Sequence, residues 1–250
     1  MKDLPSAYVA IVFWIALTVG AGCGYRYYAG ALKPADESQQ VEPVRISDDG
    51  TITFVRERLE VSVRPVSDEE LNRQFPTYSK AGAKSVNPYT FGDWKDRDFG
   101  ETPPRFTVFK LRVKNYTYPK IWLDTSKMRI VSDNGRTYST LTLPQLIGYY
   151  RTYVTGYSGN AYHAYEQRMD ILKRTLFPND VLFSGQKQEG FVVFPKLHPD
   201  VDRITVQIRD LVLRFDFRNE PVEKINIEYV FRRDIGRQYV DGTIELKKTP

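Results

Sequence analysis

The sequence predicts a mainly β domain, a sandwich or a barrel, with a helical insertion and an apolar helix at its N-terminus. Three observations support this prediction. Short segments after residue 50 alternate apolar and polar residues, which is the period of a half-buried strand. The chain contains 17 Tyr and 14 Phe, and aromatic side chains pack well on a pleated surface. Many short strands separated by turns are typical of sandwiches and barrels.

Residues 1–24 have the layout of a signal or membrane-anchor segment. Lys2 precedes a run without charged residues from Leu4 to Tyr25, and small residues surround Cys23. A basic start, an apolar middle and small residues before a cleavage site are characteristic of a secretory signal peptide. Residues 7–19 are strongly apolar and are expected to form the N-terminal helix.

Three interpretations of this segment stay open. Ala21, Gly22 and Cys23 resemble a bacterial lipobox, in which the cysteine thiol carries lipid, although Gly20 stands where a Leu-type residue is usual. An uncleaved anchor is the second interpretation, because about 20 apolar residues span a hydrocarbon core. A cleaved export signal is the third. By resemblance to lipoproteins of Gram-negative bacteria, Gly24 after the cysteine favours outer-membrane sorting, with the domain facing the periplasm or the cell surface.

Residues 25–50 are expected to be a tether between the membrane and the domain, because they lack a periodic apolar face and contain two prolines. The sandwich domain then spans residues 51–218. Ser67-Asp-Glu-Glu70 is a capping-box pattern, which predicts a short helix from Asp68 to about Arg73. Residues 74–104 are rich in Gly and Pro and predict a long irregular loop.

The clearest strand covers residues 105–115. Its apolar face holds Phe109, Leu111 and Val113, and its other face holds Lys110, Arg112 and Lys114. The helical insertion is predicted at about residues 143–176, where Pro144 opens a first helix and apolar residues from Tyr162 to Leu176 recur at steps of three and four. Residues 190–195 form an apolar run that suits burial on both faces. Residues 219–250 are expected to form a C-terminal hairpin.

Two motifs resemble a known family. Phe106–Thr117 is an alternating strand that ends in Asn and a polar turn, and Gly185–Pro195 has two glycines around a polar turn before an apolar strand that ends in Pro. Both are similar to immunoglobulin-like domains of bacterial envelope lipoproteins of unknown function. The resemblance covers roughly residues 105–210 and implies an immunoglobulin-like β-sandwich. The helices at about 143–176 would be an insertion into that pattern.

Composition and motifs argue against several kinds of chemistry. One cysteine excludes an intrachain disulfide and a cysteine-rich metal site. His163 and His198 lack companions at metal-ligand spacing, and no nucleophile elbow or phosphate-binding glycine loop is present. Glu166 and Asp170 lie four residues apart among cations, as on a solvated helix face. We therefore expect no enzyme, no cofactor, no metal and no nucleic-acid partner.

Two surfaces are predicted to interact with partners. The segment from Gly148 to Tyr165 holds six tyrosines, and tyrosine suits protein interfaces and sugar stacking. We expect Tyr162 and Tyr165 to pack in the core and the others to form the surface, namely Tyr149, Tyr150, Tyr153 and Tyr157. The basic face formed by Lys110, Arg112 and Lys114 is the candidate contact for an anionic surface such as lipid headgroups.

The sequence therefore favours a non-enzymatic, membrane-anchored envelope lipoprotein with Cys23 as the lipidation site, acting as a binding or assembly module for a protein or a glycan. Two alternatives stay open. One is an enzyme that acts on envelope polymers through carboxylates that the sequence does not pair. The other is a purely structural spacer.

Overall fold

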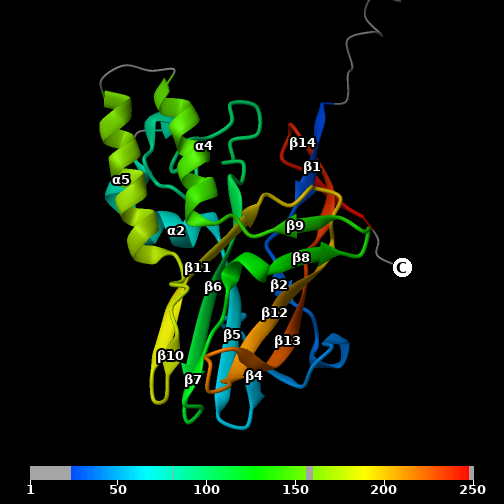
Figure 1. The fold of residues 1–250 in the computed structure, drawn as a ribbon. Coiled ribbons are helices and arrows are strands. Elements are labelled where there is room, and N and C mark those ends of the chain that lie inside the picture. The colour runs from blue at the N-terminus through cyan, green and yellow to red at the C-terminus, as the bar shows by residue number, and fades with distance from the viewer. Residues whose placement is uncertain (1–23, 81, 156–159, 248–250) are drawn as a thin grey trace, which may run out of the picture.

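The computed structural model describes residues 24–80, 82–155 and 160–247 (Figure 1). The predicted N-terminal helix and Cys23 lie outside these residues. The strands are β1 (Tyr25–Ala29), β2 (Lys33–Pro34), β3 (Val44–Ile46), β4 (Ile52–Arg56), β5 (Leu59–Val66), β6 (Phe106–Asn115), β7 (Lys120–Ile121), β8 (Arg129–Ser132), β9 (Thr137–Ser139), β10 (Leu182–Phe183), β11 (Lys187–Pro195), β12 (Arg203–Phe215), β13 (Pro221–Arg232), β14 (Ile235–Tyr239) and β15 (Ile244–Leu246). The helices are α2 (Asp68–Gln74), α3 (Pro76–Ser79), α4 (Leu143–Thr155) and α5 (Asn160–Thr175), with 3-10 turns η1 (Glu37–Gln39), η2 (Gly82–Lys84) and η3 (Thr125–Lys127).

Two five-stranded antiparallel sheets form a sandwich, so the mainly β prediction is confirmed. One sheet has the order β11-β6-β5-β4-β3 and the other has the order β2-β13-β12-β8-β9. Two smaller sheets, β1-β14-β15 and β10-β7, extend the domain at its ends. The predicted strand at 105–115 is β6, and the capping-box helix is α2, whose Glu70 N–H donates to Ser67 Oγ over 3.2 Å.

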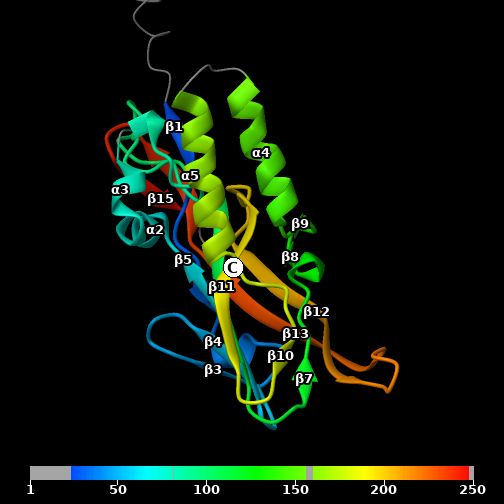
Figure 2. The same ribbon diagram turned by 60° about the vertical axis from the view of Figure 1, so that its left-hand side comes forward.

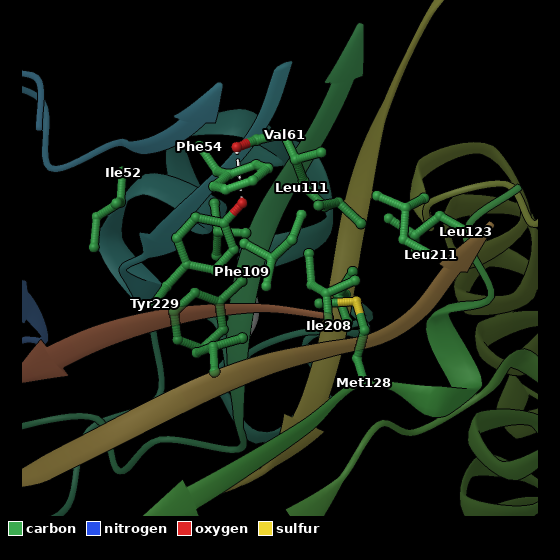
Figure 3. Close-up of a cluster of buried hydrophobic side chains, with 14 of the residues drawn as sticks. Ile52, Phe54, Val61, Phe109, Leu111, Leu123, Met128, Ile208, Leu211 and Tyr229 are labelled. Carbon is green, nitrogen blue, oxygen red and sulfur yellow. Dashed lines mark hydrogen bonds between the residues drawn. The ribbon is translucent and has the colours of Figure 1, made fainter. Parts of the chain in front are cut away.

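The main core lies between the two five-stranded sheets (Figure 3). Phe109 of β6 packs 5.3 Å from the ring of Phe231 in β13 and 5.9 Å from that of Phe194 in β11. The buried Tyr229 hydroxyl donates across the sandwich to the backbone oxygen of Val61 over 2.8 Å. This bond satisfies the one polar atom that Tyr229 brings into the core.

A second core lies on the outer face of the first sheet, beneath α2, α4 and α5. In β11, Val192 and Phe194 face the main core, whereas Phe191 and Val193 face the helices. The prediction that residues 190–195 are buried on both faces is therefore confirmed. Both views show α4 and α5 side by side as a hairpin that rises beyond the end of the sheets (Figures 1 and 2).

The described residues between 74 and 104 form α3 and η2 but no strand, and hydrogen bonds of their side chains hold them in place. Asn87 is fully buried, donates to Ser79 Oγ over 2.9 Å and accepts from the Tyr89 N–H over 2.9 Å. The Tyr89 ring is also fully buried and lies 5.2 Å from that of Phe191. The predicted irregular loop thus forms a packed layer beside the helices.

Residues 25–50 differ from the expected tether. They form β1, β2 and β3, and Val44 and Ile46 pack against the main core. These strands are only two to five residues long, so their alternation is too brief to appear as a periodic pattern in the sequence.

The C-terminal residues also differ from the predicted separate hairpin. β13 pairs with β12 along most of its length and carries buried Ile227, Tyr229 and Phe231 into the main core. The terminal hairpin is β14–β15, and β14 also pairs with β1. The two ends of the described chain therefore meet in one small sheet.

Candidate functional site

The predicted tyrosine surface is only partly exposed. Tyr150 is fully buried, because it faces the 74–104 layer rather than solvent, and its hydroxyl donates to the Pro88 oxygen over 2.5 Å. Tyr149 is partly exposed and packs with its ring 5.2 Å from that of Phe106. Tyr153 belongs to α4, and its side chain, like the whole of Tyr157, lies outside the described part of the structure.

Tyr162 also differs from the expectation, because it is exposed rather than part of the core. It stands in the first turn of α5, beyond the point where the helix contacts the second core. Tyr165 is half-buried against that core, as expected. The core side of α5 is carried by Met169, Ile171 and Leu172.

Two arginines connect the helical hairpin to the 74–104 layer, one on each side of the contact. Arg105 stacks with its guanidinium carbon 4.1 Å from the Phe91 ring centre and donates to the Tyr150 hydroxyl over 2.9 Å. Arg168 stacks 5.2 Å from the Tyr150 ring centre and donates to the Ser85 oxygen over 2.8 Å. Cation–π contacts of this kind hold the hairpin to the 74–104 layer.

The predicted basic face on β6 is compensated by carboxylates of the neighbouring strands. Lys110 and Arg112 both form 2.6 Å ion pairs with Glu189 of β11, and Lys114 forms a 3.0 Å ion pair with Glu60 of β5. Burial disfavours the charged form of Glu189, but the hydrogen bonds and charges of Lys110 and Arg112 outweigh it and lower the pKa of Glu189. The contact with an anionic surface stays a prediction, but these three cations already have carboxylate partners.

The two histidines stand apart. His163 is exposed on α5, whereas His198 lies in the loop after β11, 2.6 Å from Asp200. Among the described residues, no group of three or more His, Cys, Asp or Glu side chains is placed to hold a metal ion.

A groove with a volume of about 850 Å³ lies between the small β1–β14–β15 sheet and the loop after β11. The lining comes from β1, residues 101–104, residues 136–138, the 196–199 loop and residues near β14. No pattern in the sequence indicates this groove, because its walls come from five separated segments with no shared spacing.

One wall of the groove is a polar cluster that joins β1 and β14 to the 74–104 layer. Arg26 forms an ion pair with Glu101, and its Nε donates to Gln238 Oε1 over 2.9 Å. The Gln238 amide in turn donates to the other Glu101 oxygen over 2.9 Å. Arg26 also stacks 4.4 Å from the centre of the Phe99 ring. This cluster fixes Glu101 with both of its oxygens engaged.

The opposite wall is the 196–200 loop, which arginines hold in shape. Arg233 donates to the oxygens of Val201 and His198, over 2.7 Å in each case. Arg136 forms a 2.8 Å ion pair with Asp200, and this hydrogen bond lowers the pKa of Asp200. The loop therefore presents its side chains from a fixed backbone.

The groove carries an excess of positive charge. Four cationic side chains line it, namely Arg26, Arg136, Lys196 and Arg233, against the single lining carboxylate of Glu101. Glu101 and the neighbouring Asp200 compensate Arg26 and Arg136. No ion pair among the described residues includes Lys196 or Arg233, and burial lowers the pKa of Arg233 because its charged form is desolvated. Uncompensated charge of this kind attracts anionic groups.

Aromatic rings stand beside these cations. Tyr28 and Tyr138 are half-buried in the groove wall, and Tyr27 lies at the rim. The Tyr138 hydroxyl accepts from the His198 N–H over 3.1 Å, which ties the ring to the opposite loop. The groove thus combines aromatic faces with cationic groups.

Comparisons with known proteins give little further information. No protein-family model matches the sequence, and no curated protein matches it. Among solved structures, the chain is similar to the secreted protein MPT63 of Mycobacterium tuberculosis at 10% identity and a TM-score of 0.27, over 64% of this chain and 87% of that one. A TM-score this low does not establish a shared fold, so the fold assignment rests on the sheets themselves.

Proposed function

We propose that the protein is a non-enzymatic binding module of the bacterial cell envelope, and that the groove between β1 and the 196–200 loop takes an acidic glycan. The observation that carries this proposal is the pairing of tyrosine rings with uncompensated cations on preformed walls. Tyrosine rings stack on sugars, and the cations meet carboxylate or phosphate groups of the polymer.

The location in the envelope is supported by the sequence of the N-terminal segment, with Cys23 as the lipid attachment site and outer-membrane sorting through Gly24. Among the described residues, no helix has the length and hydropathy that a membrane span requires. In the proposed arrangement the segment before β1 holds the domain to the membrane.

The immunoglobulin type of the sandwich is part of the same proposal, and the strand order supports it. The run β5-β6-β11 corresponds to strands A, B and E of an immunoglobulin domain, and β13-β12-β8-β9 corresponds to G, F, C and C′. In this correspondence the α4–α5 hairpin is an insertion between C′ and E. The two segments with family-like motifs are then strands B and E.

Binding rather than catalysis is supported by the state of the carboxylates at the groove. Glu101 has both oxygens engaged, and Arg136 lowers the pKa of Asp200, which opposes any role as a general acid near neutral pH. The residues that line the groove in the described chain include neither serine nor cysteine. These features favour recognition of a polymer over its cleavage.

The test is direct binding of the full chain to an oligogalacturonate, a sugar polymer that carries carboxylates, beside a neutral galactose oligomer of equal length. We expect binding of the acidic oligomer that weakens as salt is raised and falls at least tenfold in Lys196→Glu. Lys187→Glu is the matched control, because Lys187 is exposed on β11, away from the groove. Equal binding of both oligomers, or no effect of Lys196→Glu, would reject the proposal.

A further inference from the structure

Three tyrosines, a valine and an arginine form a cluster toward the free end of the small β1–β14–β15 sheet. We call it the aromatic tip and define it as Tyr25, Tyr27, Arg237, Tyr239 and Val240. Tyr27 is 65% exposed, Val240 61% and Tyr25 41%. Exposed apolar side chains grouped in this way mark a contact surface more often than scattered ones do.

The side chains of the aromatic tip contact one another as a set. The Tyr25 ring lies 6.1 Å from that of Tyr27 and 6.2 Å from that of Tyr239. The guanidinium carbon of Arg237 lies 4.9 Å from the centre of the Tyr25 ring. Antiparallel pairing explains the grouping, because Tyr25 is opposite Tyr239 and Tyr27 is opposite Arg237, so all four project from the same face.

The tip also lies where the N-terminal segment joins the domain. The run without charged residues that begins at Leu4 ends at Tyr25, the first residue of β1. A Cβ atom on Gly24 would lie 3.3 Å from Cγ2 of Val240, so the turn after β14 flanks the junction. The described chain therefore starts inside the aromatic cluster.

We infer that the aromatic tip rests in the headgroup layer of the membrane that holds the N-terminal segment. The inference rests on the membrane anchoring in the proposed function. Tyrosine is enriched at this depth because its ring is apolar and its hydroxyl is polar. Arg237 adds a cation with a long apolar stem that reaches from the same layer toward water.

The dimensions fit this placement. Each headgroup layer is roughly 5–8 Å thick, taking about 30 Å for the hydrocarbon core and 40–45 Å for the whole bilayer. Tyr25 and Tyr27 are two residues apart on an extended strand, which is about 7 Å. Both rings therefore fit within one headgroup layer, and a tilt of β1 that keeps the α4–α5 hairpin, at the same end of the molecule, out of the bilayer only shortens this span (Figures 1 and 2).

The sheet cannot enter the hydrocarbon core itself. β1 is an edge strand, paired only with β14 among the described strands, and unpaired backbone groups are not tolerated in lipid. At the tip, Arg237 lies opposite Glu245 of β15, and Asp241 follows in the turn after β14. Because the tip has no excess of positive charge, aromatic partitioning drives the contact and anionic lipid adds no attraction.

Hydroxyl-radical footprinting of the full chain tests this inference without any substitution. The protein is reconstituted in phosphatidylcholine vesicles, and flotation establishes whether it is anchored. Tyr116, 47% exposed, is the internal control, because it directly follows β6, whose C-terminal end lies at the opposite end of the molecule from β1 (Figures 1 and 2). In an uncovered protein Tyr27 should be modified faster than Tyr116, because it is more exposed.

On vesicles we expect this order to invert, with Tyr27 modified at least fivefold more slowly than Tyr116, and addition of phosphatidylglycerol should leave the ratio unchanged. Flotation with Tyr27 still the faster residue would overturn the inference and leave the anchoring intact. A chain that does not float would overturn both. Protection of Tyr27 in native membranes but not in pure lipid would mean that a protein covers the tip, and the inference would again be wrong.

Discussion

Asn115 connects three parts of the fold through its side chain, so its replacement should be costly. It is fully buried at the end of β6, where its amide donates to the oxygens of Tyr118 and Leu182, over 2.8 Å and 3.0 Å. Its carbonyl accepts from the Tyr118 N–H over 2.9 Å. The residue therefore ties the turn after β6 to β10, and it is also the Asn that ends the first family-like motif.

Asn115→Ala removes these three hydrogen bonds and leaves buried backbone groups without partners. At about 1 kcal/mol for each bond, the free energy of unfolding should fall by about 3 kcal/mol. For a chain of this length that corresponds to a drop in Tm of about 6 °C. Asn115→Asp keeps the shape and the acceptor, but a second oxygen then faces two carbonyls. The loss of stability in Asn115→Asp should become smaller as pH falls. Burial raises the pKa of the new carboxyl, and its protonated form can again donate a hydrogen bond.

Urea unfolding of the three proteins, followed by tyrosine and tryptophan fluorescence at pH 5 and pH 8, measures these losses. Asn226→Ala is the control, because Asn226 is exposed and accepts a single bond from the Asp210 N–H over 2.9 Å. It should change stability by about 0.5 kcal/mol or less. If Asn115→Ala costs no more than Asn226→Ala, the turns at β6 and β10 do not depend on this side chain and the reasoning is refuted.

Two further perturbations follow from burial and from close packing. Burial, with a smaller contribution from Glu69, raises the pKa of Asp68 to about 7. The folded state therefore holds a proton that the unfolded state releases above about pH 4. Stability should fall from pH 4 to 7. Asp68→Asn should match the parent at pH 4 but exceed it by about 4 kcal/mol at pH 8 in denaturant titrations, because a pKa raised by about three corresponds to about 4 kcal/mol. The two proteins would show the same pH dependence if the carboxyl were solvated. A Cβ on Gly190 would lie 2.5 Å from the backbone of Phe177, so Gly190→Ala should cost about 1–3 kcal/mol. Gly148→Ala, in the exposed middle of α4 with nothing within 4 Å, should instead stabilise by about 1 kcal/mol, and equal signs for the two glycines in thermal unfolding would contradict the packing argument.

Local signals in the sequence were sufficient for the elements with long or strong patterns. The alternation in 105–115 identified β6, the capping box at Ser67 identified α2, and the unbroken apolar run at 190–195 identified a strand buried on both sides. In each case the pattern spans enough residues for burial to leave a visible period.

The parts of the fold and of the groove that the sequence did not predict depend on contacts between distant segments. β1 exists because it pairs with β14, more than 200 residues away, and nothing within residues 25–29 specifies that partner. Tyr150 follows the same logic, because its burial depends on a layer formed by residues 74–104. The groove is a further example, since its lining comes from five segments that meet only in the complete domain.

The groove and the aromatic tip share one strand, and this places them relative to each other. Alternation along β1 directs Arg26 and Tyr28 to one face of the small sheet and Tyr25 and Tyr27 to the other. Arg26 and Tyr28 line the groove, whereas Tyr27 marks its rim and belongs to the tip. If the tip lies in the headgroup layer, the mouth of the groove opens within one strand length of the membrane surface. A glycan bound there would lie close to the membrane, so a polymer attached to or lying on that membrane fits the groove better than one held at a distance.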